Sequence, residues 1–378
     1  MAGASPAAGG SSAGGEVRIV VVIMAGGAGT RFWPVSTQHR PKQFLQLLGD
    51  RSLLQQSYDR ALLLTRPDHV LVLTNAAFTP LVREQLPDIP AENVVGEPTR
   101  RNTAAAVALG ALLARRRFGD AVMVVLTADH LIDPPERFRQ AMLSAVKAAE
   151  REPVLYTFGI APSYPATGYG YLHRGAMVLD DDGIEHFGLV GFREKPDIDT
   201  AREYVNSGEF LWNSGMFVWS LETILAEYAA HLPGHLAALG PAVEAMNEPG
   251  ADAEEALRAA FAPLPSTSVD LAIMERATRV RMVAAPFAWN DLGGWLALEE
   301  FLEPDELGNR GQGRLALLDA EGNMVVTEDP DELIALVGVT NLIVVRAGRR
   351  TLVVDRARAE EVKELVRRLE SLGHAEHM

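Results

Sequence analysis

The stretch that most constrains this chain is an apolar run that ends in a glycine-rich loop. Residues 19–24 read IVVVIM, and the loop AGGAGTR follows at residues 25–31. The run is too short to cross a bilayer, and its β-branched residues favour a strand buried on both faces of a parallel sheet. Glycines let the backbone turn sharply and approach a ligand, and loop N–H groups can bind phosphate. Because Arg31 and Lys42 add positive charge, we predict a phosphate-binding loop here.

The residues after the glycines distinguish this loop from two common nucleotide-binding loops. A P-loop would continue with Gly-Lys-Ser/Thr, and a dinucleotide-binding loop would read G-x-G-x-x-G before a helix. Here Gly27-x-Gly29 is followed by Thr30-Arg31, and RPKQ follows at residues 40–43. The missing fingerprint argues against a dinucleotide-dependent oxidoreductase. A plain glycine turn between a strand and a helix is the structural alternative.

Composition excludes several classes of protein. The chain has 35 Lys and Arg against 50 Asp and Glu, a formal charge of −15, whereas a general nucleic-acid binder needs a basic face. It has no cysteine, so we expect no disulfide and no thiolate metal site, and a reducing cytoplasm fits. No stretch reaches transmembrane length, so we expect neither nucleic acid nor a membrane as a partner. Residues 1–15 are rich in Ala, Gly and Ser and lack a signal-peptide pattern, which predicts a disordered tail.

Strand-like and helix-like runs alternate along the first part of the chain. Strands are expected at residues 17–24, 70–74 and 121–127, and helices at 52–64, 80–86, 103–117 and 133–150. This order predicts an α/β fold with a doubly wound, mixed but mostly parallel sheet that binds ligands at the carboxyl ends of its strands. Further on, strands are expected at residues 154–160, 184–192, 215–219 and 280–285, and helices at 199–206 and within 221–262. Asn102 or Thr103 is expected to cap the alanine-rich helix.

The composition changes beyond residue 303. Short strand-like segments follow at residues 314–319, 323–327, 333–337, 341–346 and 351–354, and a charged helix is expected at 357–372. We therefore expect a catalytic domain at residues 16–303 and a small β-rich C-terminal domain at 304–378. A short β-helix and a stack of hairpins both fit this pattern.

Two aspartates follow predicted strands and suggest a metal site. Asp129 stands just after the strand at 121–127, and Asp291 lies beyond the strand at 280–285. Ligand groups in doubly wound folds lie at such strand ends, and Mg²⁺ commonly binds one or two carboxylates together with substrate phosphates and water. Each aspartate could instead be a turn residue or, for Asp129, a helix cap, and the neighbouring His130 could be purely structural.

Three further segments carry polar groups suited to a sugar phosphate. Lys195 precedes a proline, so we expect an extended backbone that holds the lysine outward toward a phosphate. Asn213 and Ser214 offer an amide and a hydroxyl beside a glycine. The segment at residues 168–170, Gly-Tyr-Gly, offers backbone N–H groups and an aromatic face. Each segment alone is only moderately informative.

The order of the motifs resembles a known family. The run GGAGTRFWP at residues 26–34, followed by RPKQF at 40–44, resembles the signature of sugar-phosphate nucleotidyltransferases, and of their mannose-1-phosphate guanylyltransferase branch in particular. The resemblance covers residues 17–295 and includes EPxxRNT at 97–103, SVD at 268–270 and DxGxW at 291–295. Gly294 stands where the family tends to have serine.

The resemblance implies a nucleotide-diphospho-sugar transferase fold, which is Rossmann-like, and a set of site residues. GMP would pass from GTP to mannose 1-phosphate, giving GDP-mannose and pyrophosphate, with Mg²⁺ as cofactor. Arg31, Lys42 and Lys195 would be catalytic, and Asp129 and Asp291 would hold the metal. The implied nucleotide-binding residues are Ala25, Gly26, Gly27, Gly29, Thr30, Arg31, Lys42, Glu97, Asn102 and Asp129. The implied sugar-binding residues are Gly168, Tyr169, Gly170, Glu194, Lys195, Asn213, Ser214 and Asp291.

Two alternatives stay open within this resemblance. The enzyme could use another sugar 1-phosphate or another NTP, or the protein could be a catalytically silent regulatory homologue, although intact Arg31, Lys42, Asp129, Lys195 and Asp291 argue against silence. Bifunctional members continue into a phosphomannose isomerase domain. Because this sequence ends at Met378, we do not expect that second activity. A β-rich tail often mediates assembly, so we expect a homodimer through the C-terminal domain.

Overall fold

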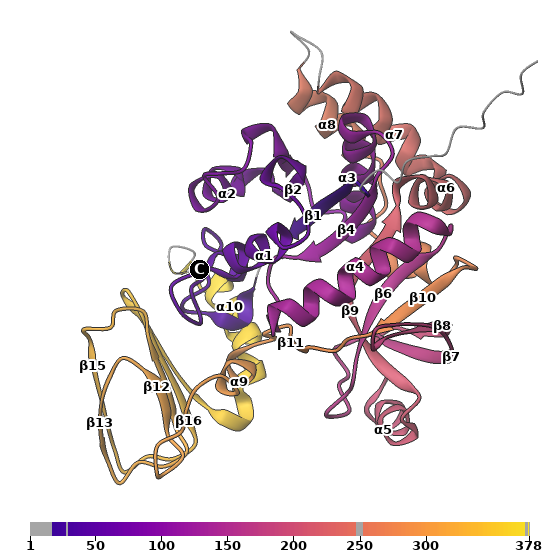
Figure 1. Ribbon diagram of the computed structural model, residues 1–378. Helices are drawn as coiled ribbons and strands as arrows, with labels where there is room; N and C mark the ends of the chain where they lie inside the picture. The colour runs from indigo at the N-terminus through magenta and orange to yellow at the C-terminus, as the bar shows by residue number, and fades with distance from the viewer. Residues whose placement is uncertain (1–16, 28, 247–251, 375–376, 378) are drawn as a thin grey trace, which may run out of the picture.

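A nine-stranded sheet forms the centre of the molecule (Figure 1). The computed structural model describes residues 17–27, 29–246, 252–374 and 377, so the expected tail at 1–15 lies outside the described residues. The strand order is β3-β2-β1-β4-β9-β6-β10-β8-β7. The strands are β1 (Ile19–Ala25), β2 (Val70–Asn75), β3 (Val94–Glu97), β4 (Val122–Thr127), β6 (Leu155–Ile160), β7 (Tyr171–Asp181), β8 (Ile184–Arg193), β9 (Phe210–Ser220) and β10 (Val280–Ala284).

Strands β1 to β4 are parallel to one another, and β1, β2 and β4 are buried on both faces, as the apolar sequences of β1 and β4 predict. Along β1, Val21 and Ile23 point into one core and Val20 and Val22 into another, because successive side chains of a strand alternate between faces. Helices α1 (Leu53–Leu62) and α4 (Pro135–Arg151) cover the first core. The second is covered by α3 (Asn102–Phe118), α6 (Leu221–His231), α7 (Pro233–Ala245) and α8 (Ala253–Phe261). The expected doubly wound α/β architecture is confirmed.

The other half of the sheet is mixed. Strand β9 runs antiparallel to both β4 and β6, whereas β10 is parallel to β6 and antiparallel to β8. Strand β7 was not expected, and β9 begins five residues before its expected start at 215. Helices α2 (Thr79–Gln85) and α5 (Ile198–Ser207) agree closely with the sequence, and β5 (Leu131–Asp133) pairs with β11 (Ala288–Asn290) in a separate two-stranded antiparallel sheet.

The strands after residue 309 wind into parallel coils. One sheet has the order β12-β14-β16-β17 and a second consists of β13 and β15, with all pairs parallel except β16 with β17. The strands are β12 (Arg310–Gln312), β13 (Arg314–Leu318), β14 (Met324–Thr327), β15 (Leu333–Val337), β16 (Leu342–Ala347) and β17 (Arg350–Asp355). Parallel pairing of successive coils identifies a short β-helix and excludes stacked hairpins. The chain continues into the 3₁₀ segment η7 (Arg356–Glu361) and helix α10 (Val362–Ser371).

A third apolar core joins the coils to the central sheet domain. It contains Phe32 and Trp33 from the glycine-loop side and Val345 and Val366 from the C-terminal side, and Figure 1 shows α10 beside α9 (Trp295–Glu299), between the two parts. The expected boundary between residues 303 and 304 stays a prediction. None of the helices in the described part of the chain has the length and apolar character that a bilayer-spanning segment needs.

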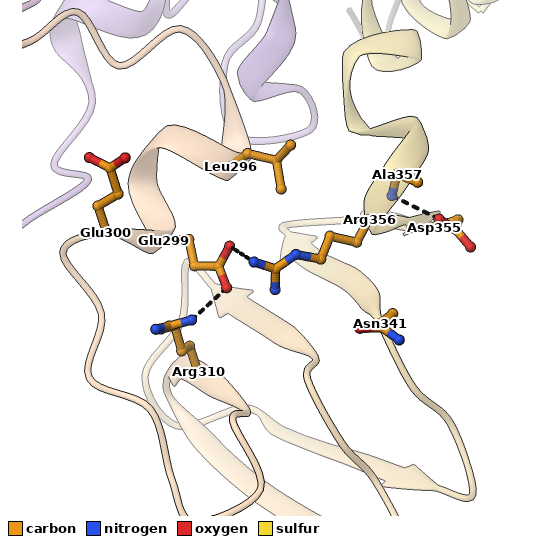
Figure 2. Close-up of a pocket in the computed structure, with 8 residues that line it drawn as sticks. All are labelled: Leu296, Glu299, Glu300, Arg310, Asn341, Asp355, Arg356 and Ala357. Atoms are coloured by element: carbon orange, nitrogen blue, oxygen red, sulfur yellow. Dashed lines mark hydrogen bonds and ion pairs between the residues drawn. The ribbon is translucent and has the colours of Figure 1, made fainter. Parts of the chain in front are cut away.

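An ion-pair cluster stands at the same junction (Figure 2). Glu299, at the end of α9, accepts hydrogen bonds from Arg310 of β12 and from Arg356 of η7. Its side chain is 8% exposed. These residues line an open cavity of about 810 Å³ between α9 and the coils. Because one buried carboxylate holds an arginine at the start of the β-helix and another at its end, it fixes how the β-helix meets α9.

Candidate active site

The glycine-rich loop is held against the segment that carries Lys42. Gly29 has a φ of 57°, and a Cβ added there would lie 2.3 Å from Cβ of Lys42, so only glycine fits this position. Ser36 Oγ donates to the carbonyl of Gly29 at 2.6 Å. The side-chain amide of Gln43 donates to the carbonyl of Ala25 at 2.9 Å. The PKQ residues therefore fix the loop in place.

Lys42 lies between the two predicted metal ligands. Its side chain is 9% exposed, its Nζ lies 2.9 Å from Oδ2 of Asp129, and it also donates to the backbone carbonyl of Asp291. Burial works against ionisation of Asp129, but the charge and hydrogen bond of Lys42 outweigh it, so the pKa of this carboxyl lies below its ordinary value. The carboxylate of Asp291 accepts a 2.7 Å hydrogen bond from the hydroxyl of Tyr169. The fold thus brings together three predicted site residues far apart in sequence, with Tyr169 beside them.

His130 supports this cluster as a neutral side chain. Burial lowers its pKa to about 4. Its Nδ1 accepts a hydrogen bond from the indole of Trp289 at 3.0 Å, so the ring proton is on Nε2, which lies 3.7 Å from Asp129. The structural interpretation of His130 therefore fits the geometry.

Glu97 is the last residue of β3, which β2 separates from β1 in the sheet, and it faces the glycine loop that follows β1. A small cavity is lined by Gly26, Gly27, Asn75, Phe78, Glu97 and Arg100. Burial raises the pKa of Glu97 to about 7. Asn102, on the same segment, is exposed with a φ of 63°, and its Oδ1 accepts from the backbone N–H of Thr103. Neither residue makes the expected capping bond to α3, because Thr103 Oγ1 accepts from the backbone of Val269 instead.

The predicted sugar side forms a second polar cluster. Asn213 accepts from Thr157 at 2.8 Å and donates to Asp270 at 2.8 Å, and its backbone N–H donates to the carbonyl of Gly170. A Cβ on Gly170 would lie 2.8 Å from a carboxylate oxygen of Glu194, so the Glu194 carboxylate lies directly against this glycine. Burial raises the pKa of Asp270 to about 6, and the nearby Glu194 adds to the rise.

Two other residues assigned to the sugar side are arranged differently. Ser214 is buried, and its hydroxyl accepts a hydrogen bond from the backbone N–H of Met216, so it stabilises strand β9. Gly168 is exposed, with no atom within 4 Å of an added Cβ.

The prediction of an extended backbone at Lys195 is wrong. Its φ is 41°, in the left-handed region, where we expected an extended residue before proline. The ammonium lies 2.8 Å from a carboxylate oxygen of Glu194, and the side chain is 60% exposed. The pair with Glu194 keeps Lys195 over the polar cluster.

Comparisons with known proteins identify the family of this chain. The nucleotidyl transferase family model matches residues 20–306, and the MannoseP isomerase/GMP-like beta-helix domain matches residues 313–369. The chain belongs to the nucleotidyl transferase family. It is 39% identical to a mannose-1-phosphate guanylyltransferase of Klebsiella pneumoniae over 95% of this chain and 75% of that protein, and 37% identical to one of Escherichia coli K12 over 96% and 76%. The crystal structure of a mannose-1-phosphate geranyltransferase from Thermus thermophilus aligns with a TM-score of 0.81 at 35% identity, covering 93% of this chain and 99% of that one.

These matches confirm the resemblance stated from the motifs, including its guanylyltransferase branch, and the β-helix near the C-terminal end of the chain. They do not assign individual site residues. The roles given to the motif residues therefore rest on geometry and are taken up below as proposals.

Arg31 of this nucleotidyl transferase contacts the C-terminal part of the chain. Its Nε lies 3.1 Å from a carboxylate oxygen of Glu360 in η7, and it also donates to the carbonyl of Gly293 at 3.2 Å. The side chain is 44% exposed. No sequence signal pointed to Glu360, because the contact crosses between two domains.

Asp270 is the other residue without a predicted role. It lies in the SVD motif, so the sequence marked the segment. Its hydrogen bond to Asn213 shows that this motif orients the amide.

The donor set at Asp129 and Asp291 fits Mg²⁺. Within the described residues no group of three or more His, Cys, Asp or Glu side chains is placed to hold a metal, so the protein offers these two carboxylates at most. Mg²⁺ favours oxygen ligands and commonly takes one or two carboxylates, completing its shell with phosphate oxygens and water.

Proposed function

We propose that the protein transfers GMP from GTP to mannose 1-phosphate and releases pyrophosphate, forming GDP-mannose. The observation that carries the proposal is the meeting of Lys42, Asp129 and Asp291 beside the glycine-rich loop in a chain of this family. The mannose-1-phosphate guanylyltransferases similar to this chain support the choice of substrates.

The reaction needs no general base from the protein. The attacking group is a phosphate oxygen, and a phosphate monoester has a second pKa of about 6, so it is largely dianionic near neutral pH. In-line attack on the α-phosphorus forms the new P–O bond as the bond to pyrophosphate breaks. The protein contributes orientation and neutralisation of charge.

Lys42 is placed to act at the reacting phosphates. An ammonium has three N–H donors, and Lys42 directs two of them to Asp129 and to the carbonyl of Asp291, which leaves one for a phosphate oxygen. Mg²⁺ held by Asp129 and Asp291 would neutralise charge on the phosphate oxygens. Arg31 would meet the leaving pyrophosphate after exchanging its contact with Glu360 for the ligand.

The second polar cluster would hold the sugar phosphate. Lys195 would bind the phosphate as a point charge, and Glu194 would accept from sugar hydroxyls. Asn213 keeps one amide N–H for a sugar oxygen, because its carbonyl and its other N–H are already engaged with Thr157 and Asp270. Tyr169 and Gly168 would flank the sugar. The glycine loop, Thr30, Glu97 and Asn102 would contact the nucleotide.

Pyrophosphate release tests the reaction directly. The purified protein should release pyrophosphate from GTP only when mannose 1-phosphate is present, and GDP-mannose should form in equal amount. A panel of sugar 1-phosphates with GTP, ATP, UTP and dTTP would identify another substrate pair. Tight nucleotide-sugar binding without turnover on any pair would favour the regulatory homologue.

We also propose that the protein works in the cytoplasm as a homodimer through its C-terminal domain. Leu318, Leu333 and Val337 project from β13 and β15 with 60%, 63% and 65% of their surface exposed. Leu318 and Val337 are paired across the two strands, and Leu333 lies four residues along β15 from Val337. Exposed apolar residues on one surface favour an interface. Replacing Val337 by Glu should convert a dimer to a monomer in analytical ultracentrifugation, and an unchanged dimer would place the interface elsewhere.

A further inference from the structure

A cavity of about 550 Å³ lies between the glycine-loop segment and helix α10. Its volume is within the range of about 300–1,000 Å³ typical of small-molecule sites. Thr30, Trp33, Ser36, Thr37, Gln38 and Pro41 line one side. Lys363, Val366, Arg367 and Glu370 line the other and, at spacings of three and four residues, occupy one face of α10.

The cavity meets the predicted nucleotide pocket at Arg100. This residue lines the cavity and also the small pocket that contains Gly26, Gly27 and Glu97. Thr30 in the cavity wall belongs to the same glycine-rich loop. A ligand whose base lies near Glu97 and whose phosphates follow the loop would therefore extend toward α10.

The charge of the cavity suits a polyphosphate. Three cations, Arg100, Lys363 and Arg367, face it with a single carboxylate, Glu370. Across the described residues, the side chains of Arg100 and Lys363 take part in no hydrogen bond or ion pair. Arg367 has only a surface contact with Glu364, at 3.0 Å. By contrast, Arg31 and Lys42 are already paired. Within the described residues, the cations of this cavity therefore keep more of their charge available for a phosphate than Arg31 and Lys42 do.

We propose that Arg100, Lys363 and Arg367 bind the terminal phosphates of GTP, so that α10 supplies part of the nucleotide site. The inference rests on the proposed function and names further binding residues for it. Pyrophosphate would lie in this cavity after the transfer, before it leaves through the open side.

The test compares ligands that differ only in their terminal phosphates. Calorimetric titration of the full chain with GTP and with GMP should show that the double change Lys363→Ala and Arg367→Ala weakens GTP binding by roughly ten- to hundredfold and leaves GMP binding unchanged. In the reverse reaction the KM for pyrophosphate should rise in parallel, while the KM for GDP-mannose stays the same. Lys363→Arg should retain GTP affinity.

Arg368→Ala is the matched control, because Arg368 lies on α10 but lines a different depression, with Leu352 and Arg358. It removes one positive charge from the same helix, whereas the double variant removes two. Equal losses of GTP affinity in this control and in the double variant would reveal only a long-range charge effect and overturn the proposal. So would an unchanged ratio of GTP to GMP affinity. If the unaltered protein binds GTP but makes no GDP-mannose, the proposed function fails, while the comparison of GTP with GMP still decides the phosphate site.

Discussion

At the scale of single residues, the site is a set of charges that compensate one another. Lys42 is nearly buried and is neutralised by Asp129, and Asp291 is held by Tyr169. An unpaired buried charge is costly, so each partner constrains the position of the other. The same pairing that stabilises the fold therefore prepares the site for phosphate.

The first prediction concerns Asp129 and Asp291 together. If both carboxylates hold one Mg²⁺, Asp129→Asn and Asp291→Asn should each lower turnover by roughly a hundredfold, and raised Mg²⁺ should partly restore it. Because groups that act as a unit are not additive, the double variant should be scarcely slower than the worse single one. Steady-state kinetics over a range of Mg²⁺ concentrations measures this. Near-normal turnover in Asp291→Asn would remove Asp291 from the site.

A second prediction concerns Lys195. Lys195→Ala should raise the KM for the sugar phosphate by roughly tenfold or more and leave the KM for GTP nearly unchanged, because a charge-assisted contact is worth about 1.5–3 kcal/mol. Initial rates with each substrate varied in turn measure both constants. A larger change for GTP would show that Lys195 serves the nucleotide.

The third prediction uses the raised pKa of Glu97. The folded carboxyl has a pKa of about 7 against an ordinary 4.5, so the folded state binds a proton that the unfolded state has lost. Stability from this group is complete below pH 4.5 and declines as the pH rises to about 7. Glu97→Gln removes the titrating carboxyl, so the free energy of unfolding should fall less with rising pH, by on the order of 1–3 kcal/mol. Urea unfolding at a series of pH values would measure it, and parallel curves for both proteins would contradict it.

At the scale of elements, the alternation of apolar runs was sufficient to predict β1, β2, β4 and the helices around them. Strand β7 was missed because its apolar residues do not alternate with polar ones, and Met177, Val178 and Leu179 are exposed. The β-helix could not be separated from hairpins, since the pairing of β13 with β15 joins segments distant in sequence. The motifs predicted site residues, and the fold brings Lys42, Asp129 and Asp291 together, while their roles stay predictions. Glu360 and Lys363 were not predicted, because only tertiary packing brings them to the loop.

The fourth prediction concerns the Glu299 cluster. Removing the charge of Glu299 by Glu299→Gln should destabilise the protein by about 2–4 kcal/mol, somewhat less than the ~3–5 kcal/mol of a fully buried pair because the arginines are partly exposed. Glu300→Gln is the control. Glu300 is the exposed neighbour of Glu299, and within the described residues its carboxylate accepts a hydrogen bond only from Asn290. Thermal unfolding compares the two variants. Equal melting temperatures would mean that the cluster does not hold the junction.

At the scale of the whole molecule, the two parts share one apolar core. Phe32 of the signature loop is fully buried, and its neighbours in that core include Ile343 and Val362 from the C-terminal part. The segment that follows the proposed GTP-binding loop is thus packed, through Phe32, against the C-terminal part of the chain.

The last prediction follows from this shared core. A chain that ends at residue 303 would expose Phe32, Trp33 and Trp295, so it should lose catalytic activity and unfold at a lower temperature than the full chain, although the central sheet is complete. Circular dichroism and pyrophosphate release on both chains measure this. A truncated chain with full activity and an unchanged melting temperature would show that the domains are independent.

The packing of Phe32 and Trp33 against the coils also restricts how such a protein can change over generations. A gene fusion could join the sheet domain of this chain to the β-helix of a relative. The two surfaces that then meet would never have been selected together. The fitness of such a fusion would depend on whether the incoming coils accommodate the two aromatic rings, even though those coils contain none of the motif residues. Recombination within the family should therefore favour exchanges that carry the FWP segment and the last helix as one heritable unit.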